Sequence, residues 1–530
     1  MKLLARRWGA CALALALALS LPAQAQAQVR LPSLGESASE DFSVGTERRT
    51  GEQIMREIRR DPAYLDDPVL LEYMQSLWQP LVAAARARGD VEPGIGQFPF
   101  EIFLVLDRSV NAFALPGGYV GVHLGLIALT SAGDELASVL AHELSHVTQR
   151  HIARSVGNSQ RASMIGLAGL ILGILAASRT GNVDMANAAI MGGQAAAIQG
   201  QLNFSRDMER EADRMGFGML GAAGFAPSGM SAMFEKMDNA SRLNDNGAFP
   251  YLRTHPLTVE RVAEARSRAL FDGGARGTPP LRHALAQARA RVLMDTDPQQ
   301  LNRLQDQASG VSGTPLRERL AAAYAGALAA SVQRNHALAE KAAADALALA
   351  RQAAPREPLA ERAVQLLQAQ VRLARGDAAA ALAALDTIEV DAQGRAPTLA
   401  RAQALLDQRR AGGGSVATMR ELTERLQTWV SDHPNDAAAW ALLSASAEAA
   451  GLKLRSLRAG AEARAASGDL NGAIDRLRAG QAAARSASAP DFIEASVIDA
   501  RLRELVAQRR ALALEARGGR GPRDDDEPPP

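Results

Sequence analysis

Apolar residues recur at three- and four-residue steps between Gly51 and Arg86, and Pro62 and Pro68 interrupt the pattern. Such spacing predicts short amphipathic helices that end near the prolines. The runs Phe100–Leu106 and Tyr119–Val122 are rich in residues that favour strands, and turn residues lie between them. The pattern therefore predicts a small β-sheet after the first helices.

A longer helix is predicted directly after the sheet. Ser131 and Asp134 have the S-x-x-D spacing of a capping box, in which the first residue caps the helix. An apolar stripe follows at helical spacing, made of Leu136, Val139, Leu140, Leu144 and Val147. The motif His142-Glu143-Leu144-Ser145-His146 then falls in the middle of this helix.

The second half of the chain, from Leu281 to about Arg517, is rich in alanine, leucine and arginine and predicts helix throughout. Short breaks with Gly-Asp or Pro-Asn pairs interrupt it at 375–377, 433–436 and 467–469. Helix pairs joined by such turns are typical of a tetratricopeptide array, although the turns do not recur at multiples of about 34 residues. We expect a degenerate array of repeats and a disordered tail over 518–530.

The first residues have the layout of a secretory signal peptide. A basic start precedes an apolar run from Ala10 to Leu19, and small residues follow at Ala23, Ala25 and Ala27. The apolar run is too short to remain as a membrane anchor. We expect a signal peptide over residues 1–27 that is cleaved near Ala25 or Ala27.

Composition narrows the class of protein. Hydrophobic residues make up 47% of the 530-residue chain and charged residues 22%, as in globular proteins, and the length predicts about two to four domains. The one cysteine, Cys11, lies in the signal segment, which excludes disulfides and cysteine catalysis for the mature chain. Cleavage also removes Lys2, Arg6 and Arg7, so the formal net charge changes from +1 to −2. Nothing in this balance indicates nucleic-acid binding.

The motif in the predicted helix has the residue types and spacing of a zinc site. Two histidines four residues apart share one face of a helix, where both imidazoles can bind one zinc ion, and Glu143 lies to one side. The alternative is a chance H-E-x-x-H on an amphipathic helix. A catalytic zinc needs a third protein ligand and an exchangeable fourth position. The candidates are Glu209, Glu211, Asp213, His151 and His255.

Two other histidines are expected to have no part in the chemistry. His151 comes nine residues after His142, about 180° round a continuous helix. We therefore expect it to point away from the metal, as a solvated cation near the helix C-terminus. His123 is expected to be a strand residue without a direct role.

Four sets of residues together resemble one known family. They are Asn111–Ala114 (N-A-F-A), Leu140–His146 (L-A-H-E-L-S-H), Ser205–Asp213 (S-R-D-x-E-x-E-A-D) and Thr254–Pro256 (T-H-P). The set resembles the gluzincin metallopeptidases of the HtpX and CAAX-prenyl protease type. The resemblance is strong in the first half of the chain and looser in the helical repeats.

The resemblance implies an α+β, mostly helical fold. A gluzincin-type zinc metalloprotease domain over 28–272 would hold a small β-sheet and the H-E-x-x-H helix. A linker over 273–280 and an all-α, tetratricopeptide-like solenoid over 281–517 would follow. Segment 162–201 would be an apolar plug or a membrane-contacting segment, and its part from Met164 to Ala177 corresponds to the place where membrane-bound relatives have transmembrane helices.

Seventeen uncharged residues between Arg161 and Arg179 begin that segment. At about 1.5 Å per residue they fall short of a hydrocarbon core of about 30 Å. We expect a helix that plugs or covers the active-site cleft, and the segment is a candidate for peripheral membrane contact. An ordinary core helix is the alternative.

The resemblance also implies roles for single residues. Glu209 is the third zinc ligand, and Asp213, one helical turn further on, hydrogen-bonds a ligand histidine or serves as a proton donor. Glu211 points elsewhere and is a surface charge. His255 is either a stabiliser of the oxyanion or a self-inhibiting fourth zinc ligand, with a loop histidine fixed by Pro256 as the alternative. We favour the inhibitory ligand.

The mechanism implied by the resemblance uses one zinc ion per chain. Zinc lowers the pKa of a bound water, and Glu143 accepts the proton and passes it to the leaving amine. Asn111 and Ala112 would hold the substrate peptide in extended form along an edge strand.

A signal peptide and a helical array added to this domain imply a periplasmic endopeptidase of a Gram-negative bacterium. The resemblance alone implies the substrates, which would be unfolded or stalled outer-membrane β-barrel proteins that the enzyme degrades or helps to assemble. The array would dock onto the β-barrel assembly machinery of the outer membrane. The alternative is a non-proteolytic chaperone or assembly factor that acts mainly through its helical repeats.

Overall fold

The computed structural model describes residues 43–156, 205–243, 249–271, 280–310, 313–486 and 491–516. The predicted signal peptide over 1–27, the apolar segment over 162–201 and the tail over 518–530 lie outside these residues, and so does the linker over 273–280 apart from Pro280. In the described ranges, no helix combines the length and the hydropathy that crossing a membrane requires.

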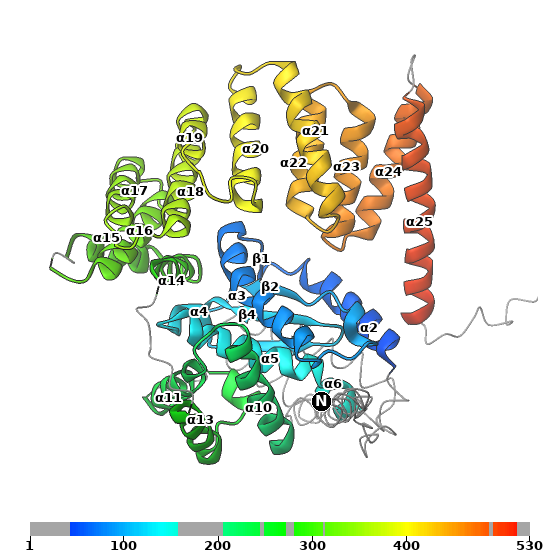
Figure 1. Ribbon diagram of the computed structural model, residues 1–530. Helices are drawn as coiled ribbons and strands as arrows, with labels where there is room; N and C mark the ends of the chain where they lie inside the picture. The colour runs from blue at the N-terminus through cyan, green and yellow to red at the C-terminus, as the bar shows by residue number, and fades with distance from the viewer. Residues whose placement is uncertain are drawn as a thin grey trace, which may run out of the picture.

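The first half of the chain combines helices with one small sheet (Figure 1). Its elements are α2 Val44–Ile58, β1 Tyr64–Leu65, α3 Pro68–Ala87, the 3-10 helix η2 Ile95–Gln97, β2 Glu101–Val105, β3 Ala112–Leu115, β4 Tyr119–His123, α4 Leu124–Leu129, α5 Gly133–Thr148, α6 His151–Val156, α10 Arg206–Ala222, α11 Ser228–Leu243, α12 Tyr251–Thr254 and α13 Val259–Phe271. The predicted helices and the two predicted strands are confirmed. The hydrophobic pattern alone missed β3, which lies among residues that favour turns.

The strands form one sheet in the order β1-β2-β4-β3. β2 and β4 are parallel, whereas β1 and β3 pair antiparallel with their neighbours. Leu104, Val120 and Val122 join α3 and α5 in the largest hydrophobic core, and Phe103 and Tyr119 pack with α2 on the other face. β3 is therefore an edge strand of the described sheet, and it lies against α5.

The predicted capping box at the start of α5 is wrong. The helix begins at Gly133, and its N-cap is Ala132, whose side chain makes no capping hydrogen bond. Asp134 instead accepts a hydrogen bond from the backbone N–H of Ala226, 3.1 Å away. Glu135 accepts the backbone N–H of Ser131 at 2.6 Å. The side chain of Asp134, which the local pattern assigned to the helix end, thus makes a tertiary contact instead.

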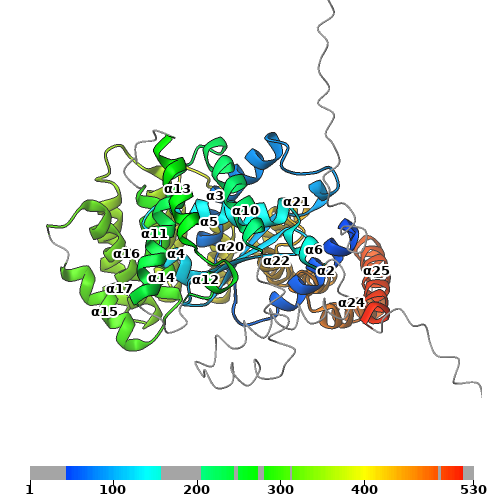
Figure 2. The same ribbon diagram turned by 90° about the horizontal axis from the view of Figure 1, so that it is seen from below.

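The second half of the described chain is all helical. Its helices are α14 Leu281–Leu293, α15 Pro298–Gly310, α16 Leu316–Val332, α17 His336–Ala350, α18 Pro358–Ala374, α19 Ala378–Leu385, α20 Arg395–Arg410, α21 Val416–Asp432, α22 Ala437–Ala449, α23 Lys453–Ala466, α24 Leu470–Ser486 and α25 Phe492–Ala516. Consecutive helices pack on one another from α15 to α25. Figures 1 and 2 show them as an arc around the sheet-containing half, with α25 at its far end.

The three predicted breaks in the array are confirmed. The chain turns between α18 and α19, between α21 and α22, and between α23 and α24. At the first break Gly376 has a positive φ of 82°, which favours glycine, and Asp377 caps α19 through the backbone N–H of Ala380. The Gly-Asp pair thus ends one helix and starts the next.

Helix α14 belongs to both halves of the molecule. Ala286 and Ala290 lie in the core that contains the sheet, whereas Leu285 and Val292 lie in the first core of the array. Its Arg289 makes a buried, two-pronged ion pair with Asp67, the N-cap of α3, at 2.7 and 2.8 Å. The two halves are therefore joined by a shared helix and a buried ion pair.

Candidate active site

The H-E-x-x-H residues lie on α5 as predicted, but in its C-terminal half and not in its middle, because the helix ends at Thr148 and His146 lies in the last turn. Their side chains are buried, with His142 1% exposed and Glu143 and His146 fully buried. The Nε2 atoms of the two histidines face each other at 3.0 Å. One turn of helix thus brings two imidazole nitrogens to one point, as the four-residue spacing requires.

Helix α10 crosses α5 and brings two carboxylates to the same point. Ser205 caps α10 by accepting the backbone N–H of Met208, so Glu209 lies in the first turn and Asp213 one turn later. Close packing is possible because Gly216 has no side chain, and a Cβ there would lie 3.2 Å from the backbone of Ala141 and His142. The Glu209 carboxylate lies 3.4 Å from Nε2 of His142 and 3.5 Å from Nε2 of His146.

His255 completes the cluster. It ends the short helix α12 and is only 2% exposed. Its Nδ1 lies 3.0 Å from Oε1 of Glu209 and 3.3 Å from Nε2 of His142. Its ring stacks on Tyr251, with ring centroids 4.6 Å apart.

The donor atoms of this cluster suit a metal ion. One ligand atom from each of His142, His146, Glu209 and His255 lies within 4.8 Å of the others. Nitrogen ligands about 2.0–2.1 Å from a tetrahedral zinc are about 3.3 Å apart, which is close to the separations seen here. Three imidazoles and one carboxylate form a donor set that zinc accepts. Among the described residues, no other cluster of this kind occurs.

Behind the cluster, Asp213 connects a histidine to an arginine that the sequence did not reveal. Nδ1 of His142 donates to Oδ1 of Asp213 at 2.9 Å. Arg261 on α13 donates to both oxygens of the same carboxylate at 2.7 and 2.8 Å, and its Nη1 lies 2.9 Å from Glu209. No spacing or motif in the sequence points to Arg261, because forty-eight residues separate it from Asp213.

Burial and close contact shift the ionisation of these groups. Burial alone would lower the pKa of His142, but hydrogen bonds to Asp213 and Glu209 outweigh it and raise that pKa to about 9. Burial, together with its histidine neighbours, lowers the pKa of His146. Despite burial, the pKa of Glu209 is lowered by His255 and His142, and that of Asp213 by Arg261 and His142. Both carboxylates are therefore anionic in the site.

Glu143 differs from the other buried carboxylates. Within the described residues, neither of its carboxylate oxygens makes a hydrogen bond, although both are buried. Nε2 of His255 lies 3.5 Å from Oε1. A buried carboxylate without a hydrogen bond is costly, so its retention indicates a group that acts on a substrate or a water.

His151 is not part of the metal cluster, as predicted, but the prediction that it is a solvated cation is wrong. Arg150 has a positive φ of 51°, so α5 ends at Thr148 and α6 begins a new direction at His151. Instead of a solvated cation, His151 is fully buried, with Nδ1 2.8 Å from Nδ1 of His146, and burial lowers its pKa to about 4. Glu211 does point away from the cluster, but it accepts a hydrogen bond from His151 at 3.1 Å.

The remaining predicted residues lie near the sheet. His123 ends β4, is buried, and its Nδ1 lies 2.9 Å from the Ser109 hydroxyl, away from the metal cluster. Asn111 and Ala112 lie at the start of the edge strand β3 and are both buried. The backbone carbonyl of Asn111 accepts the N–H of His123.

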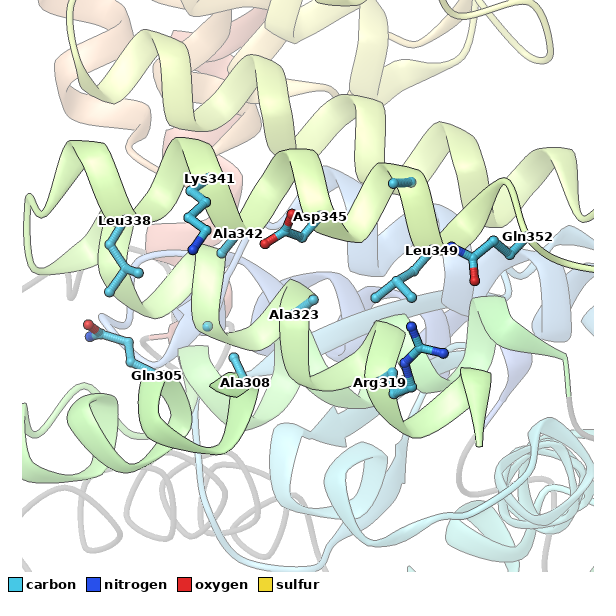
Figure 3. Close-up of a pocket in the computed structure, with 12 residues that line it drawn as sticks. Gln305, Ala308, Arg319, Ala323, Leu338, Lys341, Ala342, Asp345, Leu349 and Gln352 are labelled. Atoms are coloured by element: carbon cyan, nitrogen blue, oxygen red, sulfur yellow. The ribbon is translucent and has the colours of Figure 1, made fainter. Parts of the chain in front are cut away.

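The array has a groove of its own, far along the chain from the metal cluster. It has a volume of about 410 Å³ and lies among α15, α16 and α17 (Figure 3). Small residues such as Ala323, Gly326 and Ala342 line it, together with Lys341 and Asp345 of α17. None of its lining residues belongs to the metal cluster.

Comparisons with known proteins find matches that together cover both halves of the chain. Residues 73–269 match the model of peptidase family M48. The chain is 32% identical over 476 residues to the beta-barrel assembly-enhancing protease of Yersinia pestis. This alignment covers 90% of this chain and 91% of that protein.

Two further relatives align over a shorter range. Identity is 37% over 239 residues with the beta-barrel assembly-enhancing protease of Escherichia coli K12, which covers 45% of this chain and 47% of the relative. It is 39% over 264 residues with the putative beta-barrel assembly-enhancing protease of Vibrio cholerae, which covers 49% and 52%. These two alignments span about half the length of each relative.

Proposed function

This chain belongs to peptidase family M48 and to the beta-barrel assembly-enhancing proteases, and from that membership we propose that it is a periplasmic zinc-dependent endopeptidase. Its substrates are misassembled outer-membrane β-barrel proteins. The observation that carries the proposal is the buried convergence of two histidines and Glu209 beside Glu143, whose carboxylate has no hydrogen bond among the described residues.

The residues around the cluster divide the work of peptide hydrolysis. A zinc ion held by His142, His146 and Glu209 would activate a water and polarise the scissile carbonyl. Glu143, next to the first histidine on α5, accepts the proton of the attacking water and delivers it to the leaving amine. Asp213 and Arg261 hold His142 in place from behind.

The edge strand β3 supports the proposed path of the substrate. In the described sheet it pairs with β4 only, and α5 lies beside it. An extended peptide that adds to this edge near Asn111 and Ala112 would run beside the helix that bears Glu143. Recognition of the substrate through its backbone hydrogen bonds suits an enzyme whose substrates are unfolded β-barrel proteins.

We further propose that His255 inhibits the enzyme at rest as a fourth zinc ligand. Its Nδ1 lies in the same cluster as the other ligands, and its Nε2 lies 3.5 Å from Glu143. In that position it occupies the place of the attacking water and faces the general base. His255→Ala is expected to raise the rate of proteolysis. An unchanged or abolished rate would contradict inhibition by this histidine.

The protease proposal is tested with Glu143→Gln in the full-length protein. The wild type is expected to cleave an unfolded outer-membrane β-barrel protein, and the variant is expected to lose about three orders of magnitude in rate while it still binds zinc. Cleavage products are followed on gels, with a chelator and restored zinc as controls. Equal cleavage by the wild type and the variant would sink the proposal.

The second candidate function is a chaperone or assembly factor that acts through the array, docked on the β-barrel assembly machinery. The groove of Figure 3 favours it, and so does a cavity of about 980 Å³ between the two halves, lined by Tyr64, Asp66, Arg362 and Asp436 among others. We propose the same domain limits as above, 28–272 and 281–517. Assembly activity that survives Glu143→Gln would show that both functions coexist.

A further inference from the structure

A buried histidine lies directly behind one of the proposed zinc ligands. Nδ1 of His151 is 2.8 Å from Nδ1 of His146, and His151 is fully buried. On a continuous helix, five residues would separate the two side chains by about 140° round the axis. They meet because Arg150, with its positive φ of 51°, ends one helix and redirects the next.

The direction of each hydrogen bond follows from the metal site. Nε2 of His146 faces His142 and Glu209, so its Nδ1 carries the hydrogen and donates it to His151. Because Nδ1 of His151 then accepts, its Nε2 carries a hydrogen and donates to Oε2 of Glu211 at 3.1 Å. Arg154 donates to the same oxygen at 2.9 Å.

The two ligand histidines of α5 are therefore held by matching sets of residues. Behind His142 stand a carboxylate, Asp213, and an arginine, Arg261. Behind His146 stand His151, then the carboxylate of Glu211 and the arginine Arg154. A histidine that binds a metal almost always donates its other N–H to such an outer group, which fixes its tautomer and ring orientation.

We propose that His151 is a positioning residue for the metal site: it fixes His146 in the tautomer and orientation that bind zinc, and Glu211 fixes His151 in turn. This inference rests on the proposed zinc site. The two sets differ in one imidazole, that of His151, which stands between His146 and Glu211. Through it Glu211, a half-buried residue of α10, acts on His146 without touching it.

The test measures zinc affinity by chelator competition in the full-length protein. His151→Leu removes the acceptor and is expected to weaken zinc binding about 10- to 100-fold. His151→Asn keeps a side-chain oxygen that can accept from His146 and is expected to lose clearly less. Glu211→Gln, which keeps an acceptor but removes the charge, is expected to lose the least. This order separates positioning from a general loss of packing.

His433→Leu, at an exposed histidine of the array, is the matched control and should leave zinc affinity unchanged. Thermal unfolding of the metal-free variants shows whether each one folds. If His151→Leu does not fold, the comparison of His151→Asn and Glu211→Gln with the wild type decides the question. Wild-type affinity in every folded variant would overturn the inference. A wild type that binds no zinc and cleaves nothing would instead refute the proposed function.

Discussion

The metal cluster and the helical array use charged residues in opposite ways. In the cluster, Glu209, Asp213 and Arg261 are all at most 8% exposed and converge on one point. In the array, arginine–carboxylate pairs join neighbouring helices at the surface, as in Arg372–Glu340, with side chains 22% and 29% exposed. The cores of the array are formed by alanine and leucine instead.

This difference shows where charge serves chemistry and where it serves packing. Burying several charges costs desolvation free energy, which is recovered only when every charge has close partners. Solvent-exposed pairs are worth about 0–1 kcal/mol each, because water and salt screen their charges. The ion pair Asp67–Arg289 between the halves is an intermediate case, because it is buried like the cluster but has no part in the chemistry.

The largest effect is expected at the cluster itself. Glu209→Gln replaces an anionic ligand by a neutral amide, so zinc affinity should fall at least about 100-fold and peptidase activity should be lost. Chelator competition and substrate cleavage measure the two effects. Glu318→Gln, at an exposed glutamate of α16, is the control and should change neither. Full activity in the Glu209 variant would contradict the assignment of the buried charges of the cluster to chemistry.

The next effect is expected between the halves. Asp67→Ala leaves the guanidinium of Arg289 buried without its carboxylate and removes the N-cap of α3, so unfolding free energy should fall by about 3–5 kcal/mol. Urea unfolding measures the change. The double variant Asp67→Leu/Arg289→Met should recover much of the loss. A loss below about 1 kcal/mol would mean that burial does not strengthen this pair.

The free energy of unfolding is expected to depend on pH through His283 on α14, because this side chain is buried like the ion pair between the halves. Its Nδ1 lies 2.6 Å from the Tyr73 hydroxyl and its Nε2 donates to the carbonyl of Thr130, and burial lowers its pKa to about 4. The unfolded chain, with a histidine pKa of about 6.5, binds more protons between these values. Stability is therefore full above pH about 6.5 and falls toward pH 4, on the order of 3 kcal/mol in total.

Metal-free protein is suited to this measurement, since zinc binding also depends on pH. Unfolding free energies of the wild type and of His283→Gln are compared at pH 7 and pH 4.5. The wild type should lose more stability than the variant over this range. Equal losses would assign the pH dependence to other groups.

The smallest effect is expected at an exposed pair of the array. Asp407 and Arg410 on α20 lie 2.7 Å apart, with side chains 31% and 65% exposed. Asp407→Ala should change the unfolding free energy by less than about 0.5 kcal/mol, because solvent screens both charges. Urea unfolding checks this value. A loss as large as that of Asp67→Ala would remove the distinction between buried and exposed pairs.

Local pattern predicted much of this molecule. The spacing of His142 and His146, the break at Gly376-Asp377 and the four-residue step from Glu209 to Asp213 each depend on residues close in sequence. Their geometry follows from helical periodicity or from one turn. The capping box at Ser131 failed because Asp134 bonds instead to a backbone group ninety-two residues away.

By itself, then, the sequence determined the motif helix and the division into a sheet-containing half and a helical half, whereas the two carboxylates of α10 were singled out by the resemblance to a known family. Only the tertiary structure decided which charges are buried together. Arg261 reaches Asp213, Arg289 reaches Asp67 and His255 reaches Glu209 across distances that no periodicity encodes. His151 contacts His146 because a single residue with left-handed backbone, Arg150, changes the direction of the chain. Periodicity reports the neighbours on one helix, whereas packing between helices determines which distant charges meet.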